Sequence, residues 1–196
     1  MKERIIKIFE DSAMVKERFA KENAELIQEV VGLIAAAFTR GNKLLLFGNG
    51  GSATDASHIA GEFVNRFLLE RPGLPAIALN TDMAVITSIS NDYDYSEIFA
   101  RQVKALGQEG DVAIGISTSG TSPNVVKAFQ AAKDLGIKTV ALTGNKNKGG
   151  KLAQIADYAF IVPSAETPRI QETHITLGHV ICQLVDEHLF GSGRGK

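Results

Sequence analysis

Two loops rich in glycine and hydroxyl residues contain the side chains best suited to bind an oxyanion. The first loop, residues 48–55, reads Gly-Asn-Gly-Gly-Ser-Ala-Thr-Asp and leads into a helical pattern. Glycines allow the backbone to approach a ligand closely, and the free N–H groups at a helix start attract phosphate. The loop has neither the lysine motif of a nucleotide P-loop nor the G-x-G-x-x-G spacing. Taken alone, it fits a plain turn, capped by Ser52, Thr54 or Asp55, as well as a cradle for a phosphate or a sugar.

The second loop, residues 117–124, gives a stronger signal. Its sequence is Ser-Thr-Ser-Gly-Thr-Ser-Pro-Asn, in which Ser122 suits a helix N-cap and Pro123 suits the first helical position. A tight turn needs only one glycine and one cap, whereas here five hydroxyl side chains gather at the positive end of a helix dipole. This pattern predicts a phosphate site, and the lack of Lys or Arg in the loop indicates modest, reversible affinity.

A histidine and a glutamate lie on one face of the helix that follows the first loop. His58 and Glu62 are four residues apart, so their side chains project in the same direction. This spacing alone is typical of an exposed His–Glu pair. Because the face begins beside the first loop, the pair is also a candidate for general acid–base chemistry.

The hydrophobic pattern predicts the elements that position these loops. Short apolar runs alternate with helical patterns beyond Gly41 and predict five buried strands, at residues 44–47, 76–79, 112–116, 139–143 and 158–162. Strands buried on both faces and joined by helices form a parallel sheet with right-handed crossovers. We therefore predict an α/β fold, a three-layer αβα, doubly wound, flavodoxin-like five-stranded parallel sheet that binds its ligand at the carboxyl ends of the strands.

Helical patterns flank this core at both ends. Apolar residues recur at three- and four-residue steps over residues 5–38, which predicts an N-terminal helical extension, in two segments. A last helix is expected at 168–189, where Cys182 lies in an apolar pattern and should be a buried thiol. We predict one domain over 1–196, with helices for oligomer packing at 1–40, the core at 41–190 and a frayed tail at 191–196.

The composition excludes several classes of function. Hydrophobic residues make up 44% and charged residues 22% of the 196 residues, which is ordinary globular usage. The net charge is −1, so no basic excess is available to neutralise nucleic acid or an anionic membrane, and neither is an expected partner. The N-terminus has no apolar signal segment, and a single cysteine cannot form an internal disulfide. These features predict a cytoplasmic protein.

Together the motifs resemble a known family. Residues 48–52 and 117–120, with the late run Arg169-Ile170-Gln171-Glu172, are similar to the sugar isomerase (SIS) domain. Within that family the chain most resembles the phosphoheptose isomerases, from the first helix to about Leu189. The resemblance implies conversion of sedoheptulose 7-phosphate to D-glycero-D-manno-heptose 7-phosphate through an enediol. This is the first step toward the ADP- or GDP-heptose used in bacterial surface polysaccharide such as lipopolysaccharide.

The resemblance also implies an acid–base pair and a metal site. Glu62 matches the catalytic base and His179 the catalytic acid of the family. One zinc ion per subunit would be held by the residues that match its ligands: His58, Glu62, Gln171 and His179. A carboxylate bound to zinc is a weaker base, so Glu62 would act as ligand and base at different moments. Zinc either polarises the carbonyl or occupies a site that needs no metal for turnover.

The spacing of the last two ligands conflicts with a single straight helix. Eight residues separate Gln171 from His179, which places their α-carbons about 12 Å apart and rotates them by about 80°. Either the helix begins irregularly near Gln171 or the ligands come from different subunits. His174, three residues from Gln171, is the alternative local partner.

The matching residues for substrate binding lie mainly in the two loops. Asn91 and Asp92 match contacts to the sugar hydroxyls, although Asn-Asp is equally a common helix stop. Pro168 stands where some members of the family have an acidic residue, so the resemblance implies no acid role at that position. The full set of implied substrate contacts is Asn49, Gly50, Gly51, Ser52, Glu62, Asn91, Asp92, Ser117, Thr118, Ser119, Ser122 and Gln171.

Two other functions compete with the isomerase. Similar SIS proteins bind the bacterial replication initiator without catalysis, and residues 74–82 resemble them as well; that branch lacks counterparts of Glu62 and His179, which this chain has. A sugar-phosphate sensor is a third reading, but such domains usually accompany a DNA-binding module. The resemblance further implies a homotetramer with sites between subunits, which fits an N-terminal helical region longer than one small sheet needs for cover.

Overall fold

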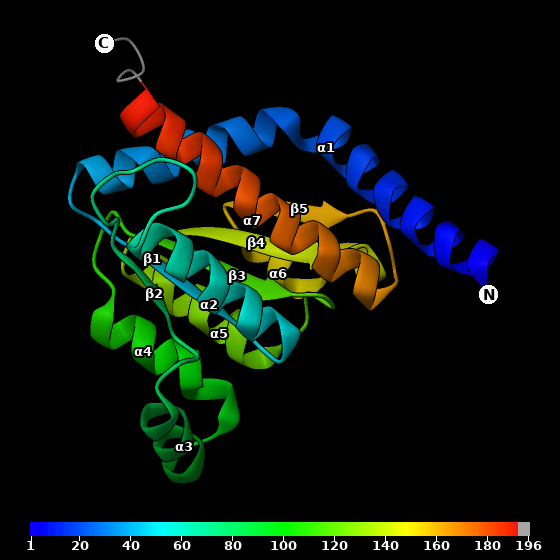
Figure 1. The fold of residues 1–196 in the computed structure, drawn as a ribbon. Coiled ribbons are helices and arrows are strands. Elements are labelled where there is room, and N and C mark those ends of the chain that lie inside the picture. The colour runs from blue at the N-terminus through cyan, green and yellow to red at the C-terminus, as the bar shows by residue number, and fades with distance from the viewer. Residues whose placement is uncertain (192–196) are drawn as a thin grey trace.

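A computed structural model describes residues 1–191 and contains one parallel sheet (Figure 1). Its strands are β1 (Leu44–Gly48), β2 (Ala76–Ala78), β3 (Val112–Ser117), β4 (Lys138–Gly144) and β5 (Tyr158–Val162). They stand in the order β2-β1-β3-β4-β5, and each neighbouring pair is parallel. The predicted five-stranded parallel sheet is confirmed, with strand ends that differ from the prediction by at most one residue. The tail predicted at 191–196 lies, apart from Gly191, outside the described residues.

Helices cover both faces of the sheet, so the fold has three layers (Figure 1). On one face lie α1 (Lys2–Thr39), α2 (Gly51–Val64) and α7 (Thr167–Phe190), and on the other α4 (Ile98–Leu106), α5 (Pro123–Asp134) and α6 (Gly150–Ile155). The side chains of β1 alternate between the two cores: Leu44 and Leu46 join the first, Leu45 and Phe47 the second. Short elements complete the chain, namely α3 (Met83–Asp92), η1 (Tyr95–Glu97) and η2 (Lys146–Gly149).

The order of the strands reverses direction between β1 and β3. The second strand of the chain lies on one side of β1, whereas β3 and its successors lie on the other. The helices that follow β1 and β3 consequently pack on opposite faces, α2 with the first core and α5 with the second. Loops that diverge in this way leave a crevice at the carboxyl ends of the strands, which is where doubly wound sheets bind ligands.

The N-terminal region is one helix, so the prediction of two helical segments is wrong. α1 is continuous over 38 residues, because it contains no proline, and ion pairs four residues apart, such as Lys7–Asp11 and Arg18–Glu22, support its exposed faces. Its residues 2–10 are exposed, Val15 packs against the edge of the core, and Phe19 is the first of its apolar side chains to be buried. Among residues 1–191, no helix is both long and apolar enough to span a membrane.

A buried arginine fixes the end of α2. The Arg71 side chain is fully buried and pairs with Asp186 of α7, with 2.8 Å between Nε and Oδ1. Its guanidinium also donates to the backbone carbonyls of Glu62 and Phe63, which belong to the last turn of α2. An arginine has five N–H donors in a rigid fork, so one side chain satisfies these carbonyls and links α2 to α7.

Candidate active site

The two predicted loops follow the two strands on either side of the reversal point. The first connects β1 to α2, and the second connects β3 to α5 (Figure 1). Gly50 is the N-cap of α2 and has a φ of 56°, a conformation that residues with a Cβ adopt only with strain. Ser52, Thr54 and Asp55 therefore lie inside α2, and the prediction that one of them caps the helix is wrong.

The second loop brings its hydroxyl groups together at the start of α5. Ser122 occupies the N-cap and Pro123 the first helical position, as predicted, but the Ser122 hydroxyl caps no helix N–H. It lies instead 2.9 Å from the hydroxyl of Ser117, and Ser119 accepts a hydrogen bond from the hydroxyl of Thr121. Ser119 Oγ also accepts the backbone N–H of Thr121, whereas the Ser117 and Ser122 hydroxyls are bonded to each other. Hydroxyls placed in this way, beside the positive end of a helix, can turn toward a phosphate oxygen.

Glycine allows a third segment to pack against this loop. Gly120 has a φ of 66°, and its carbonyl accepts the backbone N–H of Leu152. A Cβ at position 120 would collide with the carbonyl oxygen of Gly149. The segment that follows β4 is therefore packed directly against the second loop, residues 117–124, which we call the hydroxyl loop.

Two histidines and a carboxylate converge between α2 and α7. The Nε2 atom of His58 lies 3.0 Å from an oxygen of Glu62 and 3.4 Å from Nε2 of His179. One ligand atom from each of the three residues lies within 4.8 Å of the others. The ring of Phe67 stacks on His179, with 5.4 Å between ring centroids. One chain thus supplies the carboxylate and the imidazole that the sequence places 117 residues apart.

The run Arg169-Ile170-Gln171-Glu172 places four side chains in different directions. Arg169 donates to the carbonyl of Ile8 and Glu172 accepts from the hydroxyl of Ser12, so both tie α7 to α1. Ile170 is buried in the core. Gln171 lies against Gly51, where any Cβ would collide with its amide nitrogen.

Gln171 and His179 lie on a regular helix, so the first of the two explanations for their spacing, an irregular helix start, is wrong. α7 is continuous from Thr167. Gln171 is next to Gly51, at the start of α2, whereas His179 is next to His58, two turns further along. α2 and α7 run parallel. Gln171 and His179 therefore both face α2, but at positions two helical turns apart along it.

His174 does not belong to this cluster. Its side chain is fully buried and its Nε2 lies 3.2 Å from the carbonyl oxygen of Thr143, at the end of β4. Burial lowers the pKa of His174 from 6.5 to about 4, so its imidazole is neutral at physiological pH. Cys182 is also buried, as predicted, and burial raises the pKa of its thiol. Neither residue offers a group to a ligand.

The structure ties Asn49 to its surroundings but not Asn91 or Asp92. Asn49 exchanges hydrogen bonds with Asn124 and accepts one from the hydroxyl of Tyr95. Asn91 and Asp92 are exposed at the end of α3, and their only side-chain hydrogen bond within residues 1–191 joins them to each other. The helix stop expected for this pair is present at Asp92.

Asp55, Tyr95 and Asn124 are polar residues near the site whose roles sequence reasoning missed. Burial raises the pKa of Asp55, one turn before His58, and one of its carboxylate oxygens has no hydrogen-bond partner within the described chain. Asn124 is 2% exposed, although it follows a proline at an otherwise open helix start. The only signal in the sequence for a role of Asn124 is the asparagine itself, at the start of a helix. Its hydrogen-bond partner, Asn49, lies 75 residues away and cannot be identified from the local pattern.

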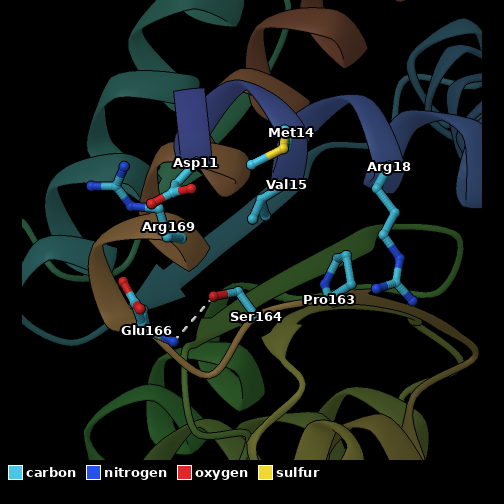
Figure 2. Close-up of a pocket in the computed structure, with 8 residues that line it drawn as sticks. All are labelled: Asp11, Met14, Val15, Arg18, Pro163, Ser164, Glu166 and Arg169. Carbon is cyan, nitrogen blue, oxygen red and sulfur yellow. Dashed lines mark hydrogen bonds between the residues drawn. The ribbon is translucent and has the colours of Figure 1, made fainter. Parts of the chain in front are cut away.

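A separate hollow lies between the first half of α1 and the segment from β5 to α7 (Figure 2). Its volume is about 440 Å³, and Arg18 and Arg169 stand at opposite ends of it in Figure 2. None of its lining residues belongs to the two loops or to the histidine cluster: Asp11, Met14, Val15, Arg18, Pro163, Ser164, Glu166 and Arg169.

Comparison with known proteins agrees with this geometry. The model of the SIS domain matches residues 8–144. A phosphoheptose isomerase of Thermodesulfovibrio yellowstonii is 64% identical over 190 residues, which cover 97% of this chain and 94% of that protein. A second, from Aquifex aeolicus, is 59% identical and the match covers 95% and 97% of the two chains. The chain belongs to the SIS domain family, among the phosphoheptose isomerases.

Solved structures place the chain in the same group. The phosphoheptose isomerase of Neisseria gonorrhoeae superposes with a TM-score of 0.88 at 40% identity, covering 95% of this chain and 98% of that one. That of Francisella tularensis gives 0.90 at 39% identity, with 94% and 97% coverage. The protein is therefore an isomerase, and the reading as a non-catalytic initiator-binding protein is not favoured.

The buried imidazole of His174 predicts a loss of stability in acid. Its folded pKa lies below the unfolded value of 6.5, so the unfolded chain binds a proton first as the pH falls toward about 4. Over this window, His174 should lower the free energy of unfolding by up to about 1.4 kcal/mol per pH unit. Urea unfolding at pH 7, 6 and 5 should show a smaller loss for His174→Gln, which can still donate to Thr143. Equal losses in the two proteins would contradict the prediction.

Proposed function

We propose that the crevice binds sedoheptulose 7-phosphate, with the phosphate at the hydroxyl loop and the carbonyl end at Glu62 and His179. The observation that supports this is the convergence of Glu62 and His179 beside the loops of β1 and β3. Ser117, Thr118, Ser119 and Ser122 would bind the phosphate. Asn49, Gly50, Gly51, Ser52 and Gln171 would contact the sugar, and Asn91 and Asp92 would require a movement or a partner subunit to do so.

The reaction moves one hydrogen between C1 and C2. Glu62, as the base, removes the proton from C1, and the electron pair of that C–H bond forms a C1–C2 double bond. The former carbonyl oxygen at C2 takes a proton from His179, which gives the enediol. His179 then recovers a proton from the C1 hydroxyl as the aldehyde forms, and Glu62 returns its proton to C2. Two positioned acid–base groups account for every proton in this sequence.

The cluster also suits a divalent metal ion. Imidazole nitrogens and a carboxylate oxygen are ligands that zinc prefers, and His58, Glu62 and His179 supply three of them at close range. Within one chain Gln171 lies two helical turns from His179, so its amide oxygen would complete the set only from a neighbouring subunit. A zinc ion bound there would supply Lewis-acid polarisation of the substrate carbonyl. His58, which lies between the other two side chains, would then hold Glu62 and His179 in register.

Replacing either acid–base group should abolish turnover. We expect Glu62→Gln and His179→Gln each to lower kcat by at least about 10³-fold, because proton transfer loses its donor or acceptor. The measurement is the rate of aldose release from sedoheptulose 7-phosphate. The exposed residues Glu187 and His188 give matched controls on α7, and Glu187→Gln and His188→Gln should retain the wild-type rate. A Glu62→Gln enzyme within tenfold of wild type would refute the assignment of the base.

Loss of a metal ligand should weaken metal binding without unfolding the chain. Equilibrium dialysis should give about one zinc ion per chain, and His58→Ala should weaken binding by at least about 100-fold, whereas His188→Ala should not. Chelation of the wild-type protein should lower kcat if the metal polarises the carbonyl. A metal-free enzyme with full activity would contradict the Lewis-acid role and leave the ion as an occupant of the site.

The first half of α1 favours assembly into a homotetramer. Its apolar side chains are exposed, among them Ile5, Ile8, Phe9 and Met14, with Phe9 at 74%. The hollow of Figure 2 lies beside the same half of the helix. A second copy packed along α1 would bury these side chains and bring a neighbour close to the start of α7. We place such an enzyme in the cytoplasm, in the synthesis of activated heptose for surface polysaccharide, with no nucleic-acid or membrane partner.

A charge on this surface should break the assembly. Phe9→Asp should convert the tetramer into smaller species in sedimentation velocity, because a carboxylate cannot be buried there without a partner. The control is Leu106→Asp, at an exposed apolar residue on the opposite layer, which should remain tetrameric. A Phe9→Asp protein with the wild-type sedimentation coefficient would exclude this half of α1 from the interface.

A further inference from the structure

Asn49 and Asn124 form a reciprocal amide pair between the two ligand-binding loops. The Nδ2 atom of each lies 2.9 Å from the Oδ1 atom of the other. Asn49 directly follows β1, and Asn124 is the second residue of α5. Asn124 is 2% exposed and Asn49 is half-buried, so the Asn124 side of the contact is shielded from water. The pair joins loops that the reversal of the sheet would otherwise let diverge.

A backbone donor fixes which way both amides face. The N–H of Val125 lies 3.0 Å from Oδ1 of Asn124, and a backbone N–H can only donate, so the atom there must be oxygen. The Nδ2 of Asn124 then points at Asn49, whose facing atom must be Oδ1. The hydroxyl of Tyr95 lies 3.0 Å from the same Oδ1 and therefore donates to it. The direction of the hydrogen bonds from Tyr95 to Asn49 and between Asn49 and Asn124 therefore follows from the single N–H group of Val125.

These contacts use up all but one polar group of the Asn49 side chain. Both lone pairs of Oδ1 are occupied, by Asn124 and Tyr95, and one N–H of Nδ2 is given to Asn124. The second N–H has no partner within residues 1–191. Asn49 can therefore offer a ligand a donor but no acceptor.

The segment that carries Tyr95 is itself held against α5. The ammonium of Lys127 lies 2.6 Å from the hydroxyl of Ser96 and 2.7 Å from a carboxylate oxygen of Glu97. Asp94 accepts the backbone N–H of Ser96 and so fixes the turn before it. Tyr95 is 54% exposed, but the contacts of its chain neighbours Asp94, Ser96 and Glu97 hold its backbone in place and so orient its hydroxyl toward Asn49.

We propose that Asn124 and Tyr95 are positioning residues that lock Asn49 as a hydrogen-bond donor. This position then recognises an acceptor oxygen of the sugar, a carbonyl or hydroxyl oxygen, and excludes a group that can only donate. The inference rests on the proposed function, because it takes the loop after β1 as the sugar-binding part of the site. To the proposed function it adds Asn124 and Tyr95 as positioning residues, and the role of the Asn49 side chain as a hydrogen-bond donor to the sugar.

Asn124→Asp tests the lock while it preserves the helix start. The carboxylate can still accept from Val125 and from Asn49, and a negative charge at a helix N-terminus is favourable, so the protein should fold. It cannot donate to Asn49, and its second oxygen faces Oδ1 of that residue. The added charge should weaken inorganic phosphate and the sugar phosphate alike. We therefore expect kcat/KM for sedoheptulose 7-phosphate to fall about tenfold further than the affinity for inorganic phosphate, measured as a competitive inhibitor.

Tyr95→Phe tests the second contact without any change in charge. It should lower kcat/KM about threefold to tenfold and leave inhibition by inorganic phosphate unchanged. Tyr93→Phe is the matched control, since Tyr93 stacks under Arg101 through its ring and its hydroxyl forms no side-chain hydrogen bond in the described chain. That variant should match the wild type.

The two levels of the hypothesis fail in different ways. Turnover of sedoheptulose 7-phosphate by the wild-type protein tests the proposed function, and its absence would overturn both. With an active wild type, the lock is overturned if Asn124→Asp weakens substrate and phosphate by the same factor. It is likewise overturned if Tyr95→Phe is indistinguishable from Tyr93→Phe.

Discussion

The close parallel packing of α2 against α7 is the contact on which the rest of the site depends. Gly178 lies against Ile59, where a Cβ would overlap the isoleucine side chain, and Gly51 lies against Gln171 in the same way. At the far end of α2, the buried pair of Arg71 and Asp186 closes the contact. The distance between two helix axes is set by the side chains at their contact, so glycines let these helices approach closely. His58, Glu62 and His179 lie along that line of approach and converge for this reason.

The site joins two kinds of chemistry that the sheet keeps on different sides. The acid–base cluster belongs to the layer of α2 and α7, whereas the hydroxyl loop opens α5 in the other layer. The reversal of strand order between β1 and β3 provides the crevice between them. The proposed substrate, with a phosphate at one end and a carbonyl at the other, would contact both layers. The hydroxyl loop has no basic side chain of its own, so in the proposed site a helix dipole and neutral donors would provide a modest affinity that lets the product leave.

Buried polar contacts support the crevice from behind. Arg71 satisfies carbonyls at the end of α2, His174 is bonded to the end of β4, and Asn124 is bonded to Asn49. Each joins the end of one element to another, where backbone groups would otherwise lack partners. A buried polar group without its partner is costly, so these contacts allow few alternative arrangements of the loops. The groups that would meet a ligand are thereby held on rigid elements.

The sequence by itself determined the sheet, the positions of the two loops and the types of residue that they and the helix after the first loop contain. Apolar runs of strand length define β1 to β5, since burial on both faces requires uninterrupted apolar residues, and local turn chemistry identified the loops. The His58–Glu62 pair follows from helix pitch alone. Two predictions from the local sequence were wrong. Two helical segments were expected where α1 is continuous, and a hydroxyl or carboxylate cap was expected where Gly50, with its positive φ, is the N-cap of α2.

Only the tertiary structure decided which distant residues meet. It brought His179 to His58, separated Gln171 from that cluster by two helical turns, removed His174 into the core and paired Asn49 with Asn124. These outcomes depend on how closely and in which direction two helices or two loops pack. That packing is set by contacts between segments more than 70 residues apart, such as Asn49 with Asn124, and periodicity within a single segment contains no information about it.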